Sequence, residues 1–477
     1  MQRCLEERTK NLKKLPTKTI NSSSIKSSFR DPSGYVFSEN GVVYRHINEV
    51  YREDYEKLMS SGLYEELVLE KLLIPHKEVS KARKDAWKVI LPDQVSFISY
   101  PYEWSFSMVK DAALATLEIQ KRAISYGMSL KDASAFNIQF VNGRPMLIDT
   151  LSFERYDDTK PWVAYKQFVE HFLSPLCLMA YGDVRLNRAT AVFLDGIPVD
   201  LAASLLPLRA RLKPSLLFHI FAHAGSSKKY SDKGLEKKYK TRKFSKRALL
   251  GMVDNLEGAV KGLHWKPEGT QWEDYYEDDK NNYKQESRRH KAELVEKYLK
   301  KVNAKRVWDY GANTGFFSRV ALKTGAEVLS FDIDFGAIEK HYLHIKANNE
   351  NNVLPLFSDL TNPTPGVGWE NEERLSLFER GPADAVLALA IIHHLAIPAN
   401  TPFSYQAQAF AKMGKNLIVE YIEKDDSQVQ ILLSTREDKF ETYTKKDFEA
   451  EFGEYFKILE KTPIKNSKRT LYLMERK

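Results

Sequence analysis

The sequence predicts an α/β fold for the C-terminal part of the chain and an α+β region before it. From about residue 283 onwards, apolar runs that end in glycine or acid alternate with helical segments, as in a parallel sheet covered by helices. A glycine turn joins the first run to a helix, and an acidic residue ends the second run. Since a domain usually has about 100–200 residues, a chain of 477 is expected to hold more than one.

The most informative segment is Val307–Ser318, which reads Val-Trp-Asp-Tyr-Gly-Ala-Asn-Thr-Gly-Phe-Phe-Ser. It predicts a strand, a turn that contains Gly311 and Gly315, and an apolar helix from Phe316. Such a turn lets the backbone approach a nucleotide-like ligand closely. The simpler alternative is that Asp309 only caps the helix that follows.

A second predicted strand, Glu327–Asp332, ends in acid about 20 residues after the turn, where dinucleotide-binding proteins place a ribose reader. A carboxylate accepts two hydrogen bonds from a diol. Asp334 is the weaker candidate, because alternate strand residues share a face. Asn313 stands where nicotinamide enzymes have their second glycine, so the turn lacks the spacing that holds a pyrophosphate.

Together these residues resemble the first motif of class I S-adenosylmethionine-dependent methyltransferases, D-x-G-x-x-x-G, matched by Asp309, Gly311 and Gly315. The resemblance covers about residues 283–477 and implies a Rossmann-like seven-stranded sheet with helices on both faces. It also implies that the turn packs under the methionine part of the cofactor and that Asp332 binds both ribose hydroxyls. The cofactor-binding residues expected on this basis are Asp309, Gly311, Ala312, Asn313, Gly315, Asp332, Ile333, Asp359, Leu360 and Ala390.

Later apolar runs continue the resemblance, and the expected strands are Asn352–Asp359, Ala383–Ala390, Lys415–Tyr421 and Arg469–Met474. The segment Ile391-Ile392-His393-His394 follows the second of these runs, at the strand end where α/β enzymes place active sites. His393 and His394 are therefore candidate general bases, or else part of the cofactor pocket wall. Enzymes that methylate amino groups of nucleobases commonly have Asn/Asp-Pro-Pro-Tyr/Phe here, so this sequence counts against that reaction.

The long segment 359–375 carries prolines, glycines and an exposed-looking Trp369. It is either a functional lid or a plain surface insertion. Its Gly-Trp-x-Asn-x-Glu-Arg sequence, the histidine pair and the later Ser434–Asp438 resemble bacterial two-domain, NoeA-like methyltransferase-like proteins, some of which are called host-specific nodulation proteins. This resemblance implies a bacterial cytoplasmic enzyme without a particular acceptor. Arg436 and Glu437 either line the site or, as we favour, pair with each other.

The first half carries a weaker motif, Asp132-x-x-x-x-Asn137, followed by an apolar strand that ends at Asp149. It resembles the catalytic and metal-binding segments of protein kinases and aminoglycoside-phosphotransferase-like enzymes, which implies magnesium ligands at Asn137 and Asp149. The alternative is an ordinary turn and strand end. Leu130 replaces the usual histidine, Thr150 replaces the usual phenylalanine, and no phosphate-binding lysine is placed. We therefore favour a kinase-like fold over phosphoryl transfer.

The kinase resemblance also predicts particular elements before the motif. These are a hairpin of Gly34–Phe37 with Val42–Ile47, a hinge strand at Val95–Tyr100 and a long helix at Met108–Tyr126. We expect four segments in all: a flexible tail (1–30), an α+β kinase-like domain (31–225), a basic linker with a helical connector (226–282) and the methyltransferase domain (283–477).

Lysines and arginines interleaved with Tyr and Phe run from Lys228 to Arg247 and suit RNA or another polyanion, or simply a solvated linker. An amphipathic helix is expected at Tyr283–Leu299, and in the family Tyr283 and Lys284 would touch the cofactor.

Composition places the chain among ordinary globular proteins, with 43% hydrophobic and 29% charged residues and a net charge of +8. Cys4 and Cys177 imply no disulfide framework, which suits a reducing cytosol. The first thirty residues lack the apolar core of a secretory signal, and charges and prolines interrupt the apolar stretch Leu201–Ala224, so no membrane span is expected. The expected location is the cytoplasm.

These observations predict an S-adenosylmethionine-dependent methyltransferase whose first domain assists the binding of an unidentified acceptor. The acceptor does not follow from the motifs, because aligning nucleophile, methyl and sulfur needs no particular acid or base. Two alternatives stay open. One is an RNA methyltransferase that uses the basic segment; the other is a cofactor-binding regulator or scaffold without catalysis.

Overall fold

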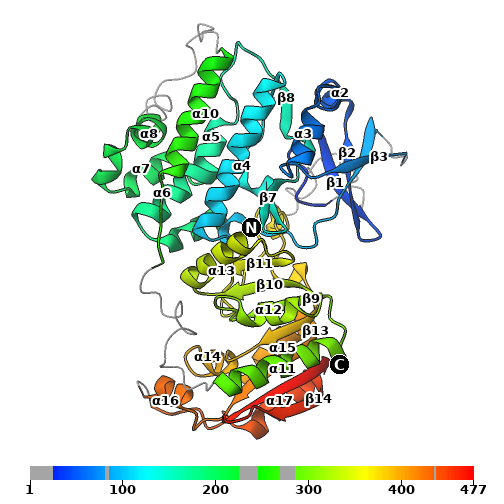
Figure 1. Cartoon of the computed structure of the whole chain (residues 1–477), viewed down its shortest axis with the longest axis vertical. Helices are drawn as coiled ribbons and strands as arrows, with labels where there is room; N and C mark the ends of the chain where they lie inside the picture. Colours follow the sequence, from blue (N-terminus) through cyan, green and yellow to red (C-terminus); the bar gives the residue numbers. More distant parts are fainter. Residues whose placement is uncertain (1–24, 81–84, 225–244, 268–284, 435–436) are drawn as a thin grey trace, which may run out of the picture. The chain divides into compact units, whose positions relative to one another are not determined.

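The computed structural model describes residues 25–80, 85–224, 245–267, 285–434 and 437–477 (Figure 1). They fall into two units. The first unit holds the described residues up to Tyr55 together with those of Pro75–Gln94. The second holds Glu56–Ile74 and the described residues from Val95 to the C-terminus.

The first unit contains an antiparallel sheet in the order β1-β2-β4-β3. Its strands are β1 (Gly34–Glu39), β2 (Val42–Ile47), β3 (His76–Val79) and β4 (Lys88–Pro92), and η1 (Glu49–Tyr51) and α2 (Arg52–Ser60) follow β2. Asn40 and Gly41 join β1 to β2 with φ angles of 52° and 77°, the geometry that suits the twist of a hairpin. The hairpin expected from the sequence is confirmed.

The second unit begins with a mainly helical region, which we call the helical part (residues 56–74 and the described residues of 95–267). Its longest helix, α4 (Phe106–Ser125), confirms the helix expected at Met108–Tyr126. Two short strand pairs follow α4, β5 with β8 and β6 with β7. The remaining elements are α3 (Leu63–Leu69), η2 (Pro101–Glu103), β5 (Met128–Leu130), η3 (Ala135–Asn137), β6 (Ile138–Val141), β7 (Arg144–Leu147), η4 (Thr150–Ser152), β8 (Phe153–Arg155), α5 (Tyr165–Phe168), η5 (Val169–Leu173), α6 (Ser174–Tyr181), η6 (Val184–Ala191), α7 (Val199–Leu205), η7 (Leu208–Leu212), α8 (Pro214–Leu216), η8 (Leu217–Ala222) and α10 (Lys246–Lys261).

The hinge strand expected at Val95–Tyr100 is wrong, because these residues are irregular. The backbone N–H of Ser99 donates to the side chain of Gln139 (2.8 Å), and that side chain donates back to the Ser99 carbonyl (2.9 Å). A glutamine side chain thus takes the place of a neighbouring strand. The apolar residues of this segment serve side-chain packing instead of a sheet.

The rest of the second unit, the sheet part (described residues from Gln285 to Lys477), contains a seven-stranded sheet in the order β11-β10-β9-β12-β13-β15-β14. Only β15 runs against the others. This order and orientation define the Rossmann-like class I methyltransferase fold. The strands are β9 (Arg306–Tyr310), β10 (Glu327–Asp332), β11 (Val353–Phe357), β12 (Ala383–Ala388), β13 (Gly414–Ile422), β14 (Phe456–Pro463) and β15 (Arg469–Arg476).

Six of these seven strands lie where the sequence predicts strands, and β14 was not predicted. Strand β14 forms the edge of the sheet, and most of its residues are partly exposed. Its Phe-Lys-Ile-Leu-Glu-Lys-Thr-Pro sequence therefore lacks the apolar run by which the buried strands were recognised.

Alternate residues of β9 point to different faces of the sheet. Val307 belongs to the buried cluster formed with α11 (Gln285–Lys301) and α12 (Phe316–Leu322), whereas Trp308 belongs to the other cluster. We call the first face the helix face and the second the far face. The remaining helices are α13 (Phe335–Asn348), α14 (Ile392–Ala396), α15 (Phe403–Met413), α16 (Ser427–Leu433) and α17 (Lys445–Tyr455).

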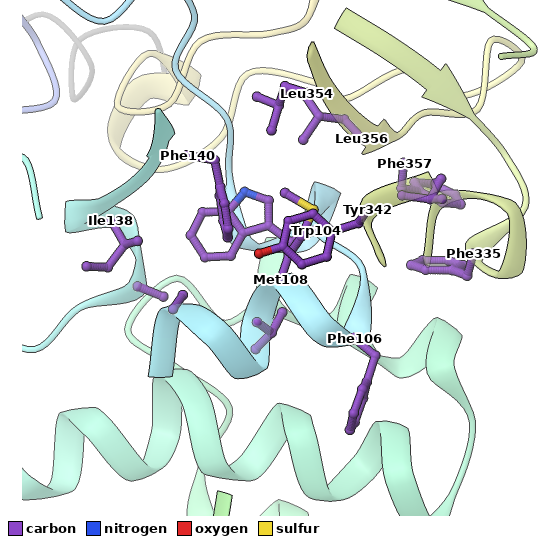
Figure 2. Packing of buried hydrophobic residues seen from close by; sticks show 14 of the residues in the cluster. Trp104, Phe106, Met108, Ile138, Phe140, Phe335, Tyr342, Leu354, Leu356 and Phe357 are labelled. Atoms are coloured by element: carbon purple, nitrogen blue, oxygen red, sulfur yellow. The ribbon is translucent and has the colours of Figure 1, made fainter. Parts of the chain in front are cut away.

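On the far face, the connection from β11 to β12 is unusual. Residues 358–382 form only two short turns, η9 (Trp369–Asn371) and η10 (Phe378–Arg380). Side chains of the helical part pack there instead: the ring of Phe97 lies 5.9 Å from that of Trp308 and 6.4 Å from that of Phe331. Figure 2 shows Trp104 and Phe140 in the same packed cluster as Tyr342. We call this contact the seam.

A buried ion pair crosses the seam. Arg380 donates to both carboxylate oxygens of Glu103, at 2.9 and 2.5 Å, and both side chains are almost fully buried. The Thr364 hydroxyl donates to the same carboxylate at 2.9 Å. On the neighbouring helix α13, Tyr342 donates to Asp111 of α4 at 2.7 Å. The seam therefore joins α4 and η2 to both the β11–β12 connection and α13.

Candidate functional site

The glycine turn lies at the carboxyl end of β9. Gly311 and Gly315 have φ angles of +70° and +85°, which disfavour side chains, and Asn313 has a φ of +52°. A Cβ on Gly315 would lie 2.2 Å from the ring of His341, so only glycine fits there. The backbone N–H groups of Gly311 and Ala312 donate to the Phe331 carbonyl of β10, which holds the turn against the carboxyl end of that strand.

Asp332 ends β10 directly opposite this turn. Its carboxylate accepts hydrogen bonds from the backbone N–H groups of Asn313 (2.7 Å) and Asp334 (2.9 Å). Burial raises the pKa of Asp332 to about 6. The next residue, Ile333, is 53% exposed although it is apolar. Asp334 itself caps α13 by accepting from the backbone N–H groups of Gly336 and Ala337, so it is committed elsewhere.

Asp309 lies under the turn, on the helix face. Its carboxylate accepts a hydrogen bond from the Ser318 hydroxyl at 2.6 Å, and burial raises its pKa to about 7. The side chain is 1% exposed, so it supports α12 and the turn from beneath.

At the end of β11, Asp359 accepts hydrogen bonds from the backbone N–H (2.8 Å) and hydroxyl (2.6 Å) of Thr361, and Leu360 beside it is partly buried. A residue that the sequence did not single out reaches the same place. The guanidinium of Arg188, from η6 of the helical part, lies 4.6 Å from the centre of the Phe357 ring. The carboxylate of Asp359 also acts electrostatically on Arg188.

At the end of β12, Ala390 has a φ of +53°, an unusual value for a residue with a Cβ. Strained backbone of this kind clusters at binding sites. The following residue, Ile391, faces the glycine turn: its Cδ1 lies 3.4 Å from the position that a Cβ on Gly311 would take. The ends of β9, β10 and β12 thus come together around the turn.

His393 and His394 lie in the first turn of the short helix α14, with ring centres 4.2 Å apart. Burial is the main cause that lowers the pKa of His394 to about 4, and the charge of Arg469 lowers it further. Burial lowers the pKa of His393 as well, and Nδ1 of His393 has no hydrogen-bond partner among the described residues. Both imidazoles are therefore neutral near pH 7 and weak bases.

A buried group of charged residues lies next to the histidines. Lys291 of α11 pairs with Glu420 of β13, and Arg469 of β15 lies 3.5 Å from the same carboxylate. Arg469 also pairs with Asp426 at 3.1 Å. We did not predict this group from the sequence. The sequence did contain an indication of this group, because Glu420 interrupts the apolar residues 417–422 of β13. Acids are rarely buried without a partner.

The kinase-like candidates lie in the helical part. Asp132 accepts hydrogen bonds from the backbone of Ser134 and the side chain of Gln167, Asp149 accepts from the backbone of Leu151, and Asn137 lies 3.4 Å from the Ser152 hydroxyl. Across the described residues, no group of three His, Cys, Asp or Glu side chains could hold a metal ion. Kinase likeness and magnesium binding stay predictions.

Several expectations concern residues outside the described ranges. Most of the basic segment Lys228–Arg247 falls there, as do Tyr283, Lys284, Arg436 and most of the 1–30 tail. The described part of the chain has no helix with both the length and the apolar character needed to cross a membrane. Trp369 is exposed, as expected from its sequence context.

The chain matches no protein-family model. It is 33% identical over 462 residues to nodulation protein NoeA of Rhizobium meliloti (strain 1021), across 95% of this chain and 96% of that protein. The chain belongs to the NoeA family. The match to NoeA extends over both units, so it includes the seam and the candidate site.

Solved structures give more distant similarities to this NoeA-family chain. PH0226 from Pyrococcus horikoshii OT3 is 19% identical and covers 43% of this chain and 99% of its own, with a TM-score of 0.32. Magnesium protoporphyrin IX methyltransferase (ChlM) from Synechocystis PCC 6803, with bound SAH, is 16% identical and covers 40% and 84%, with a TM-score of 0.30. N-methyltransferase NodS from Bradyrhizobium japonicum WM9 is 10% identical and covers 40% and 96%, also with a TM-score of 0.30.

The candidate site of this NoeA-family chain thus lies at the carboxyl ends of the parallel strands. The structure brings together the glycine turn, Asp332 and Ala390, and it places Ile333 beside them in solvent. Asp359 and Leu360 lie just after β11, the strand next to β10 in the sheet. His393 and His394 flank the buried charged group of Lys291, Glu420, Arg469 and Asp426. The kinase-like residues belong to the helical part and form no part of this site.

Proposed function

We propose that this protein is an S-adenosylmethionine-dependent methyltransferase. One observation carries the proposal: the buried carboxylate of Asp332 ends β10 opposite the glycine turn, with the apolar Ile333 exposed beside it. A carboxylate at this position accepts hydrogen bonds from a ribose diol, and an exposed apolar side chain next to it offers a surface for a base.

The charges around the turn favour this cofactor over a dinucleotide. Asp309 and Asp332 are both acidic and both border the turn, and Asn313 occupies the position of the second pyrophosphate-binding glycine. The ionised carboxylate of Asp332 repels a pyrophosphate, whereas it attracts the sulfonium and ammonium groups of S-adenosylmethionine. Gly311 and Gly315 let such a ligand approach the backbone closely.

The cofactor supplies a methyl group bound to a positively charged sulfur. The protein's part is to align an acceptor with that methyl group, which provides most of the acceleration without a dedicated acid or base. His393 and His394 suit the role of uncharged side chains that line the cofactor pocket, because burial lowers their pKa values below the usual range. The buried charges of Lys291, Glu420 and Arg469 hold α11, β13 and β15 in fixed positions behind them.

We also propose that the helical part assists binding. Arg188 supports this, because its guanidinium reaches the end of β11, where Asp359 and Leu360 are expected to bind the cofactor. Asn187, the residue before it, is buried and donates to the carbonyls of Pro101 and Trp104, which fixes η6 beside the seam. One edge of the cofactor site is then formed by the helical part.

Isothermal titration calorimetry with S-adenosylmethionine tests cofactor binding. Asp332→Asn should weaken binding at least about tenfold, because a neutral amide accepts hydroxyl hydrogen bonds less well. Asp384→Asn is the matched control, since Asp384 also accepts from two backbone N–H groups, those of Lys305 and Arg306, but at the amino end of β12. Equal affinity of the wild type and Asp332→Asn would refute the assigned site.

Methyl transfer itself needs a second measurement. The full chain is incubated with S-adenosylmethionine labelled in the methyl group and fractionated bacterial extract, and labelled products are identified. A labelled product that the wild type forms and the Asp332→Asn variant does not form would establish catalysis. Tight cofactor binding without any labelled product would instead favour the regulator or scaffold.

A further inference from the structure

Exposed apolar side chains gather on one small region of the helical part. They come from α7, η7 and η8, and they are Leu205, Leu208, Leu212, Leu217 and Phe218. The most exposed of them are Leu208 and Leu212, at 76% and 81%. The elements that carry these side chains are neighbours, since η8 contacts both α7 and η7. A contiguous exposed apolar patch marks an interaction surface.

Three cations are interleaved with these leucines. In the sequence Leu-Arg-Ala-Arg-Leu-Lys, the exposed residues Arg209, Arg211 and Lys213 alternate with or follow apolar ones. The guanidinium of Arg211 lies 4.9 Å from the Phe221 ring, and Arg209 donates to the carbonyl of Tyr181. Among the described residues, no carboxylate forms an ion pair with any of the three. Exposed cations without a counter-ion in the described part of the chain can attract an external anion.

Charge and apolarity together decide which partner fits. A nucleic acid would use the cations but would leave the leucines in water, because its outer surface is charged phosphate. An anionic membrane surface uses both, since apolar side chains enter the acyl boundary while Lys and Arg meet the headgroups.

We propose that this surface, formed by Leu205, Leu208, Leu212, Leu217 and Phe218 with the cations Arg209, Arg211 and Lys213, docks the protein on anionic lipid membranes. The protein would bind at the surface of the membrane and would not cross it. The proposal goes beyond the methyltransferase assignment and does not depend on it, because the surface belongs to the helical part and shares no residue with the cofactor site.

Sedimentation with lipid vesicles tests the docking. The full chain is mixed with phosphatidylcholine vesicles that contain either no anionic lipid or about one-third phosphatidylglycerol, a composition that gives a negative surface potential. We expect binding to the anionic vesicles, weakened by added salt, and little binding to neutral ones. The double variant Leu208→Asp/Leu212→Asp and the triple variant Arg209→Gln/Arg211→Gln/Lys213→Gln should each lower the partition coefficient about tenfold or more.

Leu69→Asp is the matched control, because Leu69 of α3 is 80% exposed and lies outside the surface; its binding should equal that of the wild type. Thermal unfolding of each variant provides a second readout. Exposed leucines can be replaced without lowering the melting temperature. A marked drop in the double variant would show that these leucines are covered in the folded protein, which would overturn the proposal.

Polyuridylic acid serves as the competing ligand in the same assay. If the full chain binds this RNA but not the anionic vesicles, the lipid proposal is wrong. If vesicle binding persists unchanged in both surface variants, another part of the chain binds lipid and the assignment of this surface fails.

Discussion

The two faces of the seven-stranded sheet are covered in different ways. On the helix face, α12 of the sheet part itself packs over β9 and β10, and α11 packs beside it against α12 and β15. The cluster contains residues such as Val295 and Phe317. On the far face, the same two strands meet Phe97, which belongs to the irregular segment before α4. The helix face is closed by helices of the sheet part, and α15 and α17 of the same part cover the far face over β12 and β13. Over β9 and β10, in contrast, the far face is closed by residues more than 200 positions away.

This difference follows from the connection between β11 and β12. Residues 358–382 supply only two short turns, so they leave apolar residues such as Trp308 and Phe331 without a covering helix. An exposed sheet face of this kind would be unstable in water. The helical part closes it, and the buried pair of Glu103 and Arg380 fixes the contact. We therefore expect the sheet part and the helical part to unfold together.

The largest effect is expected from breaking the ion pair across the seam. Glu103→Leu leaves the charge of Arg380 buried and unpaired, which should lower the free energy of unfolding by about 3–5 kcal/mol. Urea denaturation measures this. The control is Arg289→Ala, since the pair of Arg289 and Glu293 is exposed and should contribute less than about 1 kcal/mol. If Glu103→Leu proves no worse than the control, the seam does not stabilise the fold.

A pair of core substitutions tests whether both faces unfold together. Phe97→Ala removes a ring from the far face and Phe317→Ala removes one from the helix face; each should cost about 3 kcal/mol. Calorimetry should show a single transition shifted by both variants, because the sheet is common to the two cores. Two separate transitions, each sensitive to one variant, would contradict the idea of one folding unit.

A smaller effect separates backbone geometry from packing at the glycine turn. Gly315→Ala places a methyl group against the His341 ring, whereas Gly325→Ala, with a similar φ of +81°, meets nothing within 4 Å. Both pay the cost of a positive φ, about 1–2 kcal/mol. Only Gly315→Ala should lose roughly a further 2 kcal/mol from overpacking, measured by urea denaturation. Adding His341→Ala should recover part of that loss.

The smallest effect concerns the pH dependence of cofactor binding. Because burial raises the pKa of Asp332 to about 6, the group is mostly protonated at pH 5 and ionised at pH 8. Only the ionised carboxylate accepts hydrogen bonds from both ribose hydroxyls. Affinity should therefore fall about tenfold from pH 8 to pH 5, measured by calorimetry. The Asp332→Asn variant should bind weakly at both pH values, and an unchanged slope in that variant would assign the titration to another group.

The site was easier to predict than the seam. Gly311, Gly315 and Asp332 lie within 22 consecutive residues of one strand–turn–helix–strand segment, so their approach is local and follows from the turn itself. Lys291, Glu420 and Arg469 were missed, because their contacts join elements that are far apart in the chain. Arg188 was missed for the same reason. The prediction of a hinge strand was wrong because the backbone N–H of Ser99 donates to the side chain of Gln139 instead of to a neighbouring strand. The alternation of apolar and polar residues does not reveal such a contact.

The sequence by itself determined the α/β class, the glycine turn and the acid that ends β10, because strand periodicity and turn chemistry act between near neighbours. Only the tertiary structure decided how the far face is closed, since packing between distant segments depends on the fit of side chains such as Phe97, Trp308 and Phe331. It also decided that His393 and His394 are buried and neutral, because burial depends on the surroundings of a residue and not on its type.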